Sequence, residues 1–389
     1  MLKTENLILL NMLSSKYLNL FEMFGDNVDT MPIPKTKKND ADSYIEDLLS
    51  EGKKRHIRVI GYAGTGKSTY INNNYSCHEY ILTSYTRIAA VQINGNTLSS
   101  IFQLGRLNEN SVVAAISAMR YFTPRILINI QIVKGIVIDE FYTAPAAIIE
   151  KVNLICQAVR ECNEPFGGLQ LILVGDVRQT QSVDSAFVDS DLYKSLVFEE
   201  IILPEHPLMR LTSEYMAFCN IFRNPKLNRD KMLRLLKDKR FAQEEVKDAY
   251  TVYYTNKEVN KRNADGMCNF NGDVIYEYMK TGYKKNCPIY IKNNTGPFCN
   301  GMMGFLRKRI GKNLVIEVDG QEHEVKSSQI DFVPGFATTI HRCQSKTWAG
   351  VNIYIRKTDV FLNRSLYIRL LYVALTRVRH FDRCYISLY

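Results

Sequence analysis

Short apolar runs alternate with amphipathic stretches from Ile57 onward, and several of these runs are rich in Ile, Leu and Val. Such runs are typical of buried strands in a parallel sheet, because helices cover both faces of that kind of sheet. The pattern therefore predicts an α/β fold, with function expected where the strands end. The first group of expected strands covers residues 57–60, 80–83, 135–138 and 169–174.

A second group of apolar runs occurs later, at residues 251–254, 351–355 and 384–387, and indicates a second α/β lobe. Between the runs of this second group, residues 286–330 are short apolar stretches separated by hairpin signals such as Gly311-Lys-Asn and Asp319-Gly320. This segment predicts a small β insertion in the second lobe.

The first 45 residues start apolar and end in a turn-rich, basic segment, which favours an appendage and a linker. The predicted domains are then the appendage at 1–45, the first lobe at 46–205, the second lobe at 206–285 with 331–389, and the insertion at 286–330.

Composition narrows the class of protein. A chain of 389 residues predicts two or three domains at about 150 residues each, and 46% hydrophobic with 23% charged residues is ordinary globular composition. The net charge of +10 favours a polyanionic partner such as nucleic acid. No apolar run reaches the roughly 18 residues of a membrane span, so we expect a soluble intracellular protein without a membrane partner. Nine scattered cysteines without a Cys-x-x-Cys pair predict reduced thiols and no structural zinc.

A phosphate-binding loop is the clearest chemical signal. Gly61-Tyr-Ala-Gly-Thr-Gly66-Lys67-Ser68 fits the pattern G-x-x-x-x-G-K-[ST], follows an expected strand and leads into an expected helix. The glycines let main-chain N–H groups point inward, Lys67 reaches the β- and γ-phosphates, and the Ser68 hydroxyl ligates magnesium. The predicted nucleotide-binding residues are Gly61, Gly64, Thr65, Gly66, Lys67, Ser68, Thr69 and Asp176.

Acidic residues follow a second apolar strand, in Gly135-Ile-Val-Ile-Asp139-Glu140. Asp139 is the expected magnesium ligand together with Ser68, and Glu140 is the expected base that orients and deprotonates the attacking water. The run at 169–174 leads to Asp176 and Gln179, which are expected to sense the γ-phosphate side of the site. A phosphate loop also occurs in small-molecule kinases, so these residues alone leave the phosphate acceptor open.

With these three sites in order, the sequence resembles a superfamily 1 helicase. Residues 338–347, Thr-Thr-Ile-His-Arg-Cys-Gln-Ser-Lys-Thr, are similar to the fifth motif of that family, and residues 371–379 are similar to its sixth. The closest branch is the 5′-to-3′ group of RecD and the petite-integration-frequency helicases, which residues 83–102 and 293–301 resemble. Alphavirus-type viral helicases are the second choice, because they account less well for residues 83–102 and 286–330.

The resemblance implies two RecA-like lobes that bind ATP and Mg²⁺ between them and move on single-stranded or tailed duplex nucleic acid, DNA in preference to RNA. It also implies possible partners among replication-complex proteins. The implied catalytic residues are Lys67, Glu140 and Gln179 from the first lobe, with Arg223 and Arg377 from the second. Arginines suit this role because a guanidinium neutralises charge on the γ-phosphoryl oxygens.

Candidate nucleic-acid contacts stand at positions that match the family's motifs: Thr86, Thr97, Ser100 and Phe102 in the first lobe, and Thr339, His341 and Thr347 in the second. Two positions depart from the family, since Ser99 replaces a frequent His and Ser345 a usual Gly. Three functions therefore stay open: a 5′-to-3′ DNA helicase, a viral-type RNA helicase or movement-protein NTPase, and a nucleotide-regulated nucleic-acid-binding module that does not unwind.

Overall fold

The structure is a computed structural model that describes residues 56–104, 115, 118–176, 179, 186–204, 212–224, 226–247, 249–343, 348–358 and 364–389. The predicted appendage at residues 1–45 lies outside the described residues. The chain divides into two compact units, the first ending at Leu203 and the second running from Pro204 to Tyr389, with Tyr62–Thr65 and the neighbourhood of Gln179 grouped with the second.

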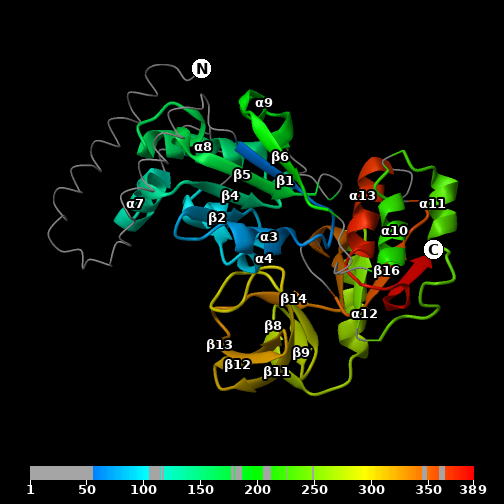
Figure 1. Cartoon of the computed structure of the whole chain (residues 1–389). Helices are drawn as coiled ribbons and strands as arrows, with labels where there is room; N and C mark the ends of the chain where they lie inside the picture. The colour runs from blue at the N-terminus through cyan, green and yellow to red at the C-terminus, as the bar shows by residue number, and fades with distance from the viewer. Residues whose placement is uncertain are drawn as a thin grey trace. The chain divides into compact units, whose positions relative to one another are not determined.

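The first unit is built on a six-stranded sheet in the order β3-β2-β4-β5-β1-β6, in which every pair is parallel (Figure 1). The predicted α/β fold with a parallel sheet is confirmed, and the four expected strands of this half correspond to β1, β2, β4 and β5. The strands are β1 His56–Ile60, β2 Tyr80–Ser84, β3 Asn96–Thr97, β4 Gly135–Asp139, β5 Gln170–Gly175 and β6 Phe198–Ile202.

Alternate residues of the central strands face opposite layers. Val137, Ile172 and Val174 pack with Ile71 on one face of the sheet, which leaves Ile136 and Leu171 for the other. All of these side chains are fully buried, which explains why the strands are continuous apolar runs. The helices of this unit are α3 Lys67–Asn74, α4 Arg87–Gln92, α5 Leu98–Ile101, α7 Pro124–Ile132, α8 Ala146–Val159 and α9 Asp191–Ser195, with 3-10 turns η1 Phe141–Thr143, η2 Pro165–Gly168 and η3 Phe187–Asp189.

The second unit has a four-stranded parallel sheet in the order β15-β7-β16-β17, whose core includes the fully buried Val252, Ile353 and Leu371. The predicted strands of this half correspond to β7, β16 and β17, whereas β15 was not predicted. The elements are β7 Tyr250–Tyr253, β15 Ala337–Thr339, β16 Val351–Ile355, β17 Cys384–Leu388, α10 Ser213–Ile221, α11 Arg229–Leu235, α12 Asn256–Asn269, α13 Arg364–Leu375, η4 Ile340–Cys343 and η6 Phe381–Arg383.

Antiparallel strands with a core of their own lie between β7 and β15 in the chain. One sheet has the order β13-β12-β11-β10-β14, a second pairs β8 with β9, and two of the turns fall at the predicted signals Gly311 and Asp319-Gly320. The predicted domain limits themselves stay predictions. The strands are β8 Val274–Tyr278, β9 Thr281–Lys284, β10 Pro288–Ile291, β11 Met303–Ile310, β12 Asn313–Val318, β13 Gln321–Lys326 and β14 Phe332–Pro334.

Within the described ranges, none of the helices combines the length and the apolar character that crossing a bilayer requires.

Candidate functional site

The loop between β1 and α3 has the backbone of a phosphate cradle. Gly64 and Gly66 both have φ of 84°, a left-handed conformation that side chains with a Cβ rarely adopt. Thr65 donates two hydrogen bonds to the Tyr62 carbonyl, at 3.2 Å from its N–H and 3.0 Å from its hydroxyl. Gly66 is the residue before α3, so the loop turns directly into a helix N-terminus, where N–H groups favour anions.

Lys67 folds back over the start of this loop. Its side chain is 8% exposed, and its Nζ donates a hydrogen bond to the Gly61 carbonyl at 3.1 Å. The N–H of Gly61 in turn donates to the Gly175 carbonyl at the end of β5, at 3.2 Å. The next two predicted residues lie at the start of α3, with Ser68 half-buried and Thr69 exposed.

The acidic pair is fixed by the strand next to β4. The Ser84 hydroxyl at the end of β2 donates to the main-chain carbonyl of Asp139 at 2.9 Å, and the N–H of Glu140 donates to Asp139 Oδ1 at 2.9 Å. Burial raises the pKa of the Asp139 carboxyl to about 7; the Glu140 charge acts in the same direction, and the Lys67 charge opposes it. A cation beside Asp139 would therefore favour the carboxylate form.

Glu140 has an unusual backbone for a residue with a Cβ. It adopts φ 51° and ψ 39°, and its side chain is only 8% exposed. A left-handed non-glycine residue costs roughly 1–2 kcal/mol, and such conformations cluster at functional sites. Two hydrogen bonds from Thr143 to the Glu140 carbonyl, at 2.9 Å from N–H and 2.8 Å from the hydroxyl, hold the turn.

Three adjacent strands end at this edge of the first-unit sheet. Because the order is β4-β5-β1 and all pairs are parallel, the residues that follow them lie at one edge: Asp139 and Glu140 after β4, Asp176 after β5 and Gly61 after β1. Asp176 is 1% exposed. Four of the predicted nucleotide-site residues, Gly61, Asp139, Glu140 and Asp176, therefore lie at the same sheet edge. Gln179 is a buried residue three positions beyond Asp176.

The oxygen ligands available at this sheet edge are suited to magnesium. The Asp139 carboxylate and the Ser68 hydroxyl are hard ligands of the kind that Mg²⁺ selects, and a phosphate-bound ion needs only one or two protein ligands. The residues present are therefore compatible with a magnesium nucleotide.

The two predicted arginines belong to the second unit. Arg377 follows α13, is 2% exposed and donates to the Val373 carbonyl from Nε at 2.7 Å and to the Cys343 carbonyl from Nη1 at 3.3 Å. Its Nη2 also donates to the Thr376 hydroxyl at 2.9 Å. Arg223 follows α10 and is half-buried. Their predicted role as catalytic cations stays a prediction.

Comparison with known proteins shows which proteins the chain resembles. Residues 36–215 match the family model described as PIF1-like helicase. The match covers just under half of the chain. It is 30% identical over 159 residues to the human ATP-dependent DNA helicase PIF1, an alignment that covers 40% of this chain and 24% of the human protein. In three curated relatives the alignments span between 24% and 35% of the relative's length.

Solved structures of PIF1-like helicases share the fold over most of the chain. A Pif1 helicase from Candida albicans has a TM-score of 0.68 at 19% identity and covers 92% of this chain and 95% of that one. A Bacteroides Pif1 helicase, solved with ADP-AlF3 and ssDNA, has a TM-score of 0.65 at 20% identity and covers 92% and 93%. The predicted RecA-like architecture is thereby confirmed.

Two of the predicted nucleic-acid residues in the first unit are helix caps. The Thr86 hydroxyl accepts from the Ala89 N–H at 3.4 Å at the start of α4, and the Thr97 hydroxyl accepts from the Ser100 N–H at 3.1 Å at the start of α5. Ser100 is exposed. Phe102 contradicts its prediction, because its ring is fully buried in the core and is not placed to stack on a base. Burying the apolar surface of this ring is favoured over leaving it in water.

The predicted nucleic-acid contacts of the second unit also differ in exposure. Thr339 is buried, and its carbonyl accepts a hydrogen bond from the Cys343 thiol at 3.3 Å. His341 is exposed on η4. The predicted contact Thr347 lies outside the described residues. Ser84 was not predicted from the sequence, although a hydroxyl residue at the end of a strand beside the acidic strand is a usable signal.

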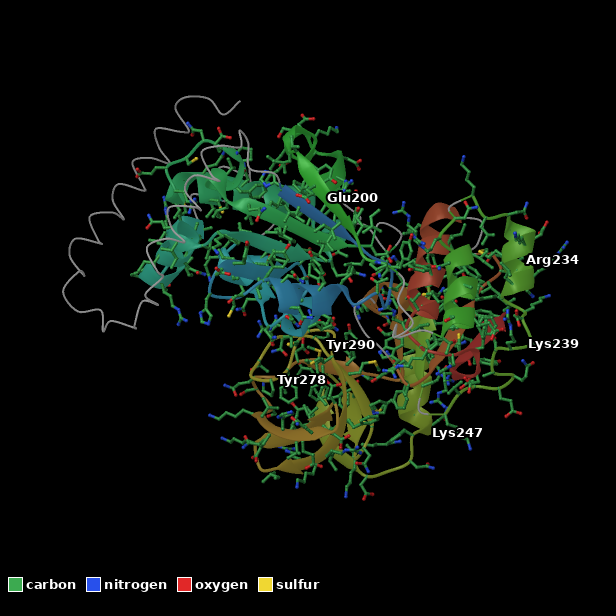
Figure 2. The ribbon with its side chains drawn as sticks, viewed as in Figure 1. Glu200, Arg234, Lys239, Lys247, Tyr278 and Tyr290 are labelled. Atoms are coloured by element: carbon green, nitrogen blue, oxygen red, sulfur yellow. The ribbon has the colours of Figure 1, made fainter. Side chains whose placement is uncertain are left out.

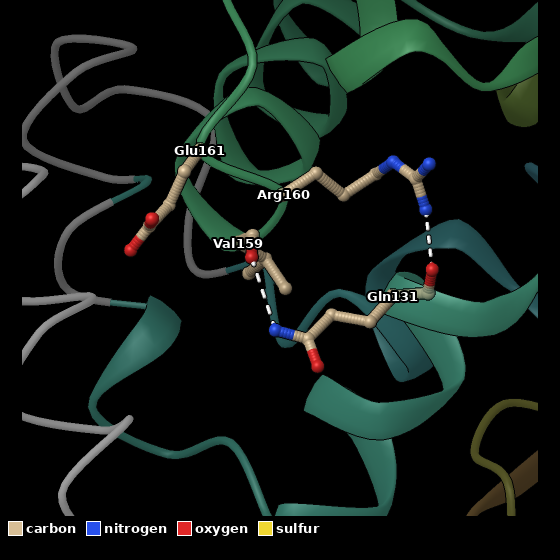
Figure 3. A pocket seen from close by; sticks show the side chains of 4 residues that line it. All are labelled: Gln131, Val159, Arg160 and Glu161. Carbon is tan, nitrogen blue, oxygen red and sulfur yellow. Dashed lines mark hydrogen bonds between the residues drawn. The ribbon is translucent and has the colours of Figure 1, made fainter.

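A pocket of about 270 Å³ lies between α7 and α8, lined by Gln131, Val159, Arg160 and Glu161 (Figure 3). The Arg160 guanidinium donates to the carbonyls of Gly167, Ile130 and Gln131. Because α7 leads into β4 and α8 runs back from its end, these residues lie at the sheet edge opposite the phosphate loop. The pocket is therefore not part of the nucleotide site.

Proposed function

We propose that this chain is an ATP-dependent motor that hydrolyses ATP with Mg²⁺ and moves along single-stranded DNA in the 5′-to-3′ direction. The observation that carries the proposal is the shared sheet edge, where the phosphate loop, the Asp139-Glu140 pair and Asp176 follow three adjacent strands. Nucleotide hydrolysis requires a phosphate cradle, a metal ligand and a base within one site, and these residues supply one of each.

Ser68 and Asp139 would hold the magnesium ion. Once bound, the ion supplies positive charge that offsets the charge developing on the phosphates. Lys67 exchanges its bond to the Gly61 carbonyl for the β- and γ-phosphate oxygens, which are stronger acceptors than a carbonyl because they are charged. The left-handed loop glycines let the main chain approach those phosphates closely.

Glu140 is the proposed base. It orients a water molecule toward the γ-phosphorus and takes the proton as the P–O bond to the leaving ADP breaks. The turn held by Thr143 keeps the Glu140 backbone in one conformation, which fixes the point from which its side chain starts. Asp176 and Gln179 are the proposed sensors of the γ-phosphate, and Arg377 and Arg223 are the proposed cations that neutralise its oxygens.

The choice of DNA rests on the relatives. The human relative is described as an ATP-dependent DNA helicase, and the Bacteroides Pif1 was solved with ssDNA. The net charge of +10 is suited to a polyanionic track. The 5′-to-3′ direction follows from the resemblance of residues 83–102 and 293–301 to that branch.

A strand-displacement assay tests the proposal as a whole. Duplexes of DNA and of RNA, each with a 5′ or a 3′ single-stranded tail, are incubated with ATP and Mg²⁺. We expect displacement of the 5′-tailed DNA duplex alone. Preferential displacement of RNA would overturn the substrate, displacement from the 3′ tail would overturn the direction, and nucleotide-dependent binding without displacement would indicate a binding module.

A further inference from the structure

The 3-10 turn η4 follows β15 directly and contains two consecutive exposed residues, His341 and Arg342. Each lies against an aromatic ring from a different element of the second unit. His341 lies beside Tyr254, which directly follows β7, and the Arg342 guanidinium lies over the ring of Tyr290 in β10. This turn therefore connects the parallel sheet with the antiparallel strands through two polar–aromatic contacts.

Tyr254 is held in a defined place. β15 pairs with β7 in parallel register, Thr339 opposite Tyr253, so the residues that follow these strands emerge at the same sheet edge. The Tyr254 and His341 ring centres are 6.3 Å apart at an interplanar angle of 40°. The Tyr254 ring also lies 5.2 Å from that of Tyr367, which is 1% exposed on α13. Tyr254 is itself partly exposed, so it joins the buried core to the surface.

The second contact is built in the same way. Arg342 lies 5.2 Å from the centre of the Tyr290 ring, and Tyr290, which is labelled in Figure 2, is 5% exposed. Burial raises the pKa of the Tyr290 phenol to about 12. A guanidinium over a neutral aromatic ring is a cation–π arrangement, which helps to hold the cation in place at the surface.

We propose that Tyr254 and His341 form a stacking platform for one unpaired base, and that Arg342 binds the phosphate beside it. Single-strand tracks combine flat side chains for bases with cations for the backbone, and both occur here on consecutive residues of one turn. The inference rests on the proposed function and adds to it a base contact at Tyr254. Stacking is tolerant of sequence because every base has an aromatic face, as a motor that moves along a strand requires.

Single-strand affinity of point variants tests the platform. Binding of the full chain to a short oligothymidylate is measured by fluorescence anisotropy for wild type, Tyr254→Leu and Tyr254→Phe. We expect Tyr254→Leu to weaken binding about 10-fold, the usual effect of losing one stacked base, and Tyr254→Phe to stay within about 2-fold. The matched control is Tyr253→Leu, because Tyr253 is also partly exposed but stacks on Tyr354 at 4.9 Å and 19°. The control should bind like wild type.

A base-deletion series keeps the test independent of folding. Wild type is titrated with oligothymidylates that carry one abasic site at each position in turn. We expect one position to lose about 10-fold in affinity, and the same abasic site to add nothing to the loss in Tyr254→Leu. Arg342→Gln should instead reduce the salt dependence by about 0.7 in the log–log slope.

The outcomes separate the inference from the function on which it rests. If wild type binds oligothymidylate but Tyr254→Leu binds equally well, or if Tyr253→Leu is weakened as much, the platform is wrong and the motor function stands. If no abasic position weakens wild type, the base contact is likewise wrong. If wild type does not bind any single strand, the proposed function itself fails.

Discussion

The N–H of Leu171 donates a hydrogen bond to Nδ1 of His56 at 3.0 Å, which links β5 to the strand that leads into the phosphate loop. Nδ1 must be unprotonated to accept this bond, so the folded protein holds a neutral imidazole. His56 is 7% exposed, and burial lowers its pKa from 6.5 to about 4.

The free energy of unfolding should therefore decrease at acidic pH, because His56 takes up a proton more readily in the unfolded chain. Between pH 6.5 and about 4 the unfolded chain binds the proton and the folded chain does not, so the free energy of unfolding rises with pH across this window. The contribution is fully present above pH 6.5 and is lost as the pH falls toward 4, on the order of 1–3 kcal/mol. Urea unfolding at several pH values measures it.

His56→Asn is the matched variant, because the amide oxygen can accept the Leu171 N–H bond but does not titrate. When the pH is lowered from 6.5 to 4, the unfolding free energy of the wild type should decrease by about 1–3 kcal/mol more than that of His56→Asn. Parallel pH curves for the two proteins would show that His56 is not the group responsible.

Any side chain at Gly66 should weaken nucleotide binding. Gly66→Ala must hold φ of 84° with a Cβ, at a cost of about 1–2 kcal/mol, or shift the loop. We expect weaker nucleotide binding, measured with a fluorescent ATP analogue. Gly296→Ala is the control, since Gly296 has φ of 51° with open space around it and lies in the second unit. If both variants bind nucleotide like wild type, the loop conformation is not required.

Gly135 should be required for the first-unit sheet. A Cβ there would lie 2.3 Å from the Gln170 carbonyl oxygen in the neighbouring β5, where only a backbone shift can relieve the contact. We expect Gly135→Ala to lose about 2–4 kcal/mol of unfolding free energy. In Gly282→Ala the Cβ meets only Val274 methyl groups at 3.3 Å, so the loss should be smaller. Equal losses would contradict this packing argument.

Arg377 should affect both stability and hydrolysis. Its guanidinium donates to the buried carbonyls of Val373 and Cys343, so Arg377→Met should lose about 2–4 kcal/mol of unfolding free energy. Arg377→Lys keeps the charge but not the planar fork, and should lower kcat at least about 100-fold with a smaller loss of stability. Wild-type turnover in Arg377→Lys would exclude a catalytic role for the guanidinium.

The central strands were predictable because burial on both faces makes them continuous apolar runs, as in β4 and β5. The edge strand β6 was not, since two of the five residues of Phe198-Glu-Glu-Ile-Ile202 are glutamates and the segment is a strand only by pairing with β1. β3 and β15, with two and three residues, are too short for any periodicity to develop.

The phosphate loop and the acidic pair could be predicted because each motif needs particular residue types at fixed spacing. Phe102 could not be assigned, because an apolar ring in a short helix has the same sequence pattern whether it packs inward or contacts a ligand. The sequence did not indicate a role for Tyr254 either. Its neighbour His341 is 87 positions away in the chain, and only strand pairing brings the two residues together.

The most direct test of the account is ATP hydrolysis by Glu140→Gln in the presence of single-stranded DNA, with nucleotide affinity measured on the same preparation. The variant keeps the shape of the side chain and removes the proton acceptor. We expect kcat to fall by about 10²–10⁴, with nucleotide affinity unchanged within a few-fold. Turnover equal to wild type in this variant would contradict the assignment of Glu140 as the base and, with it, the proposed mechanism.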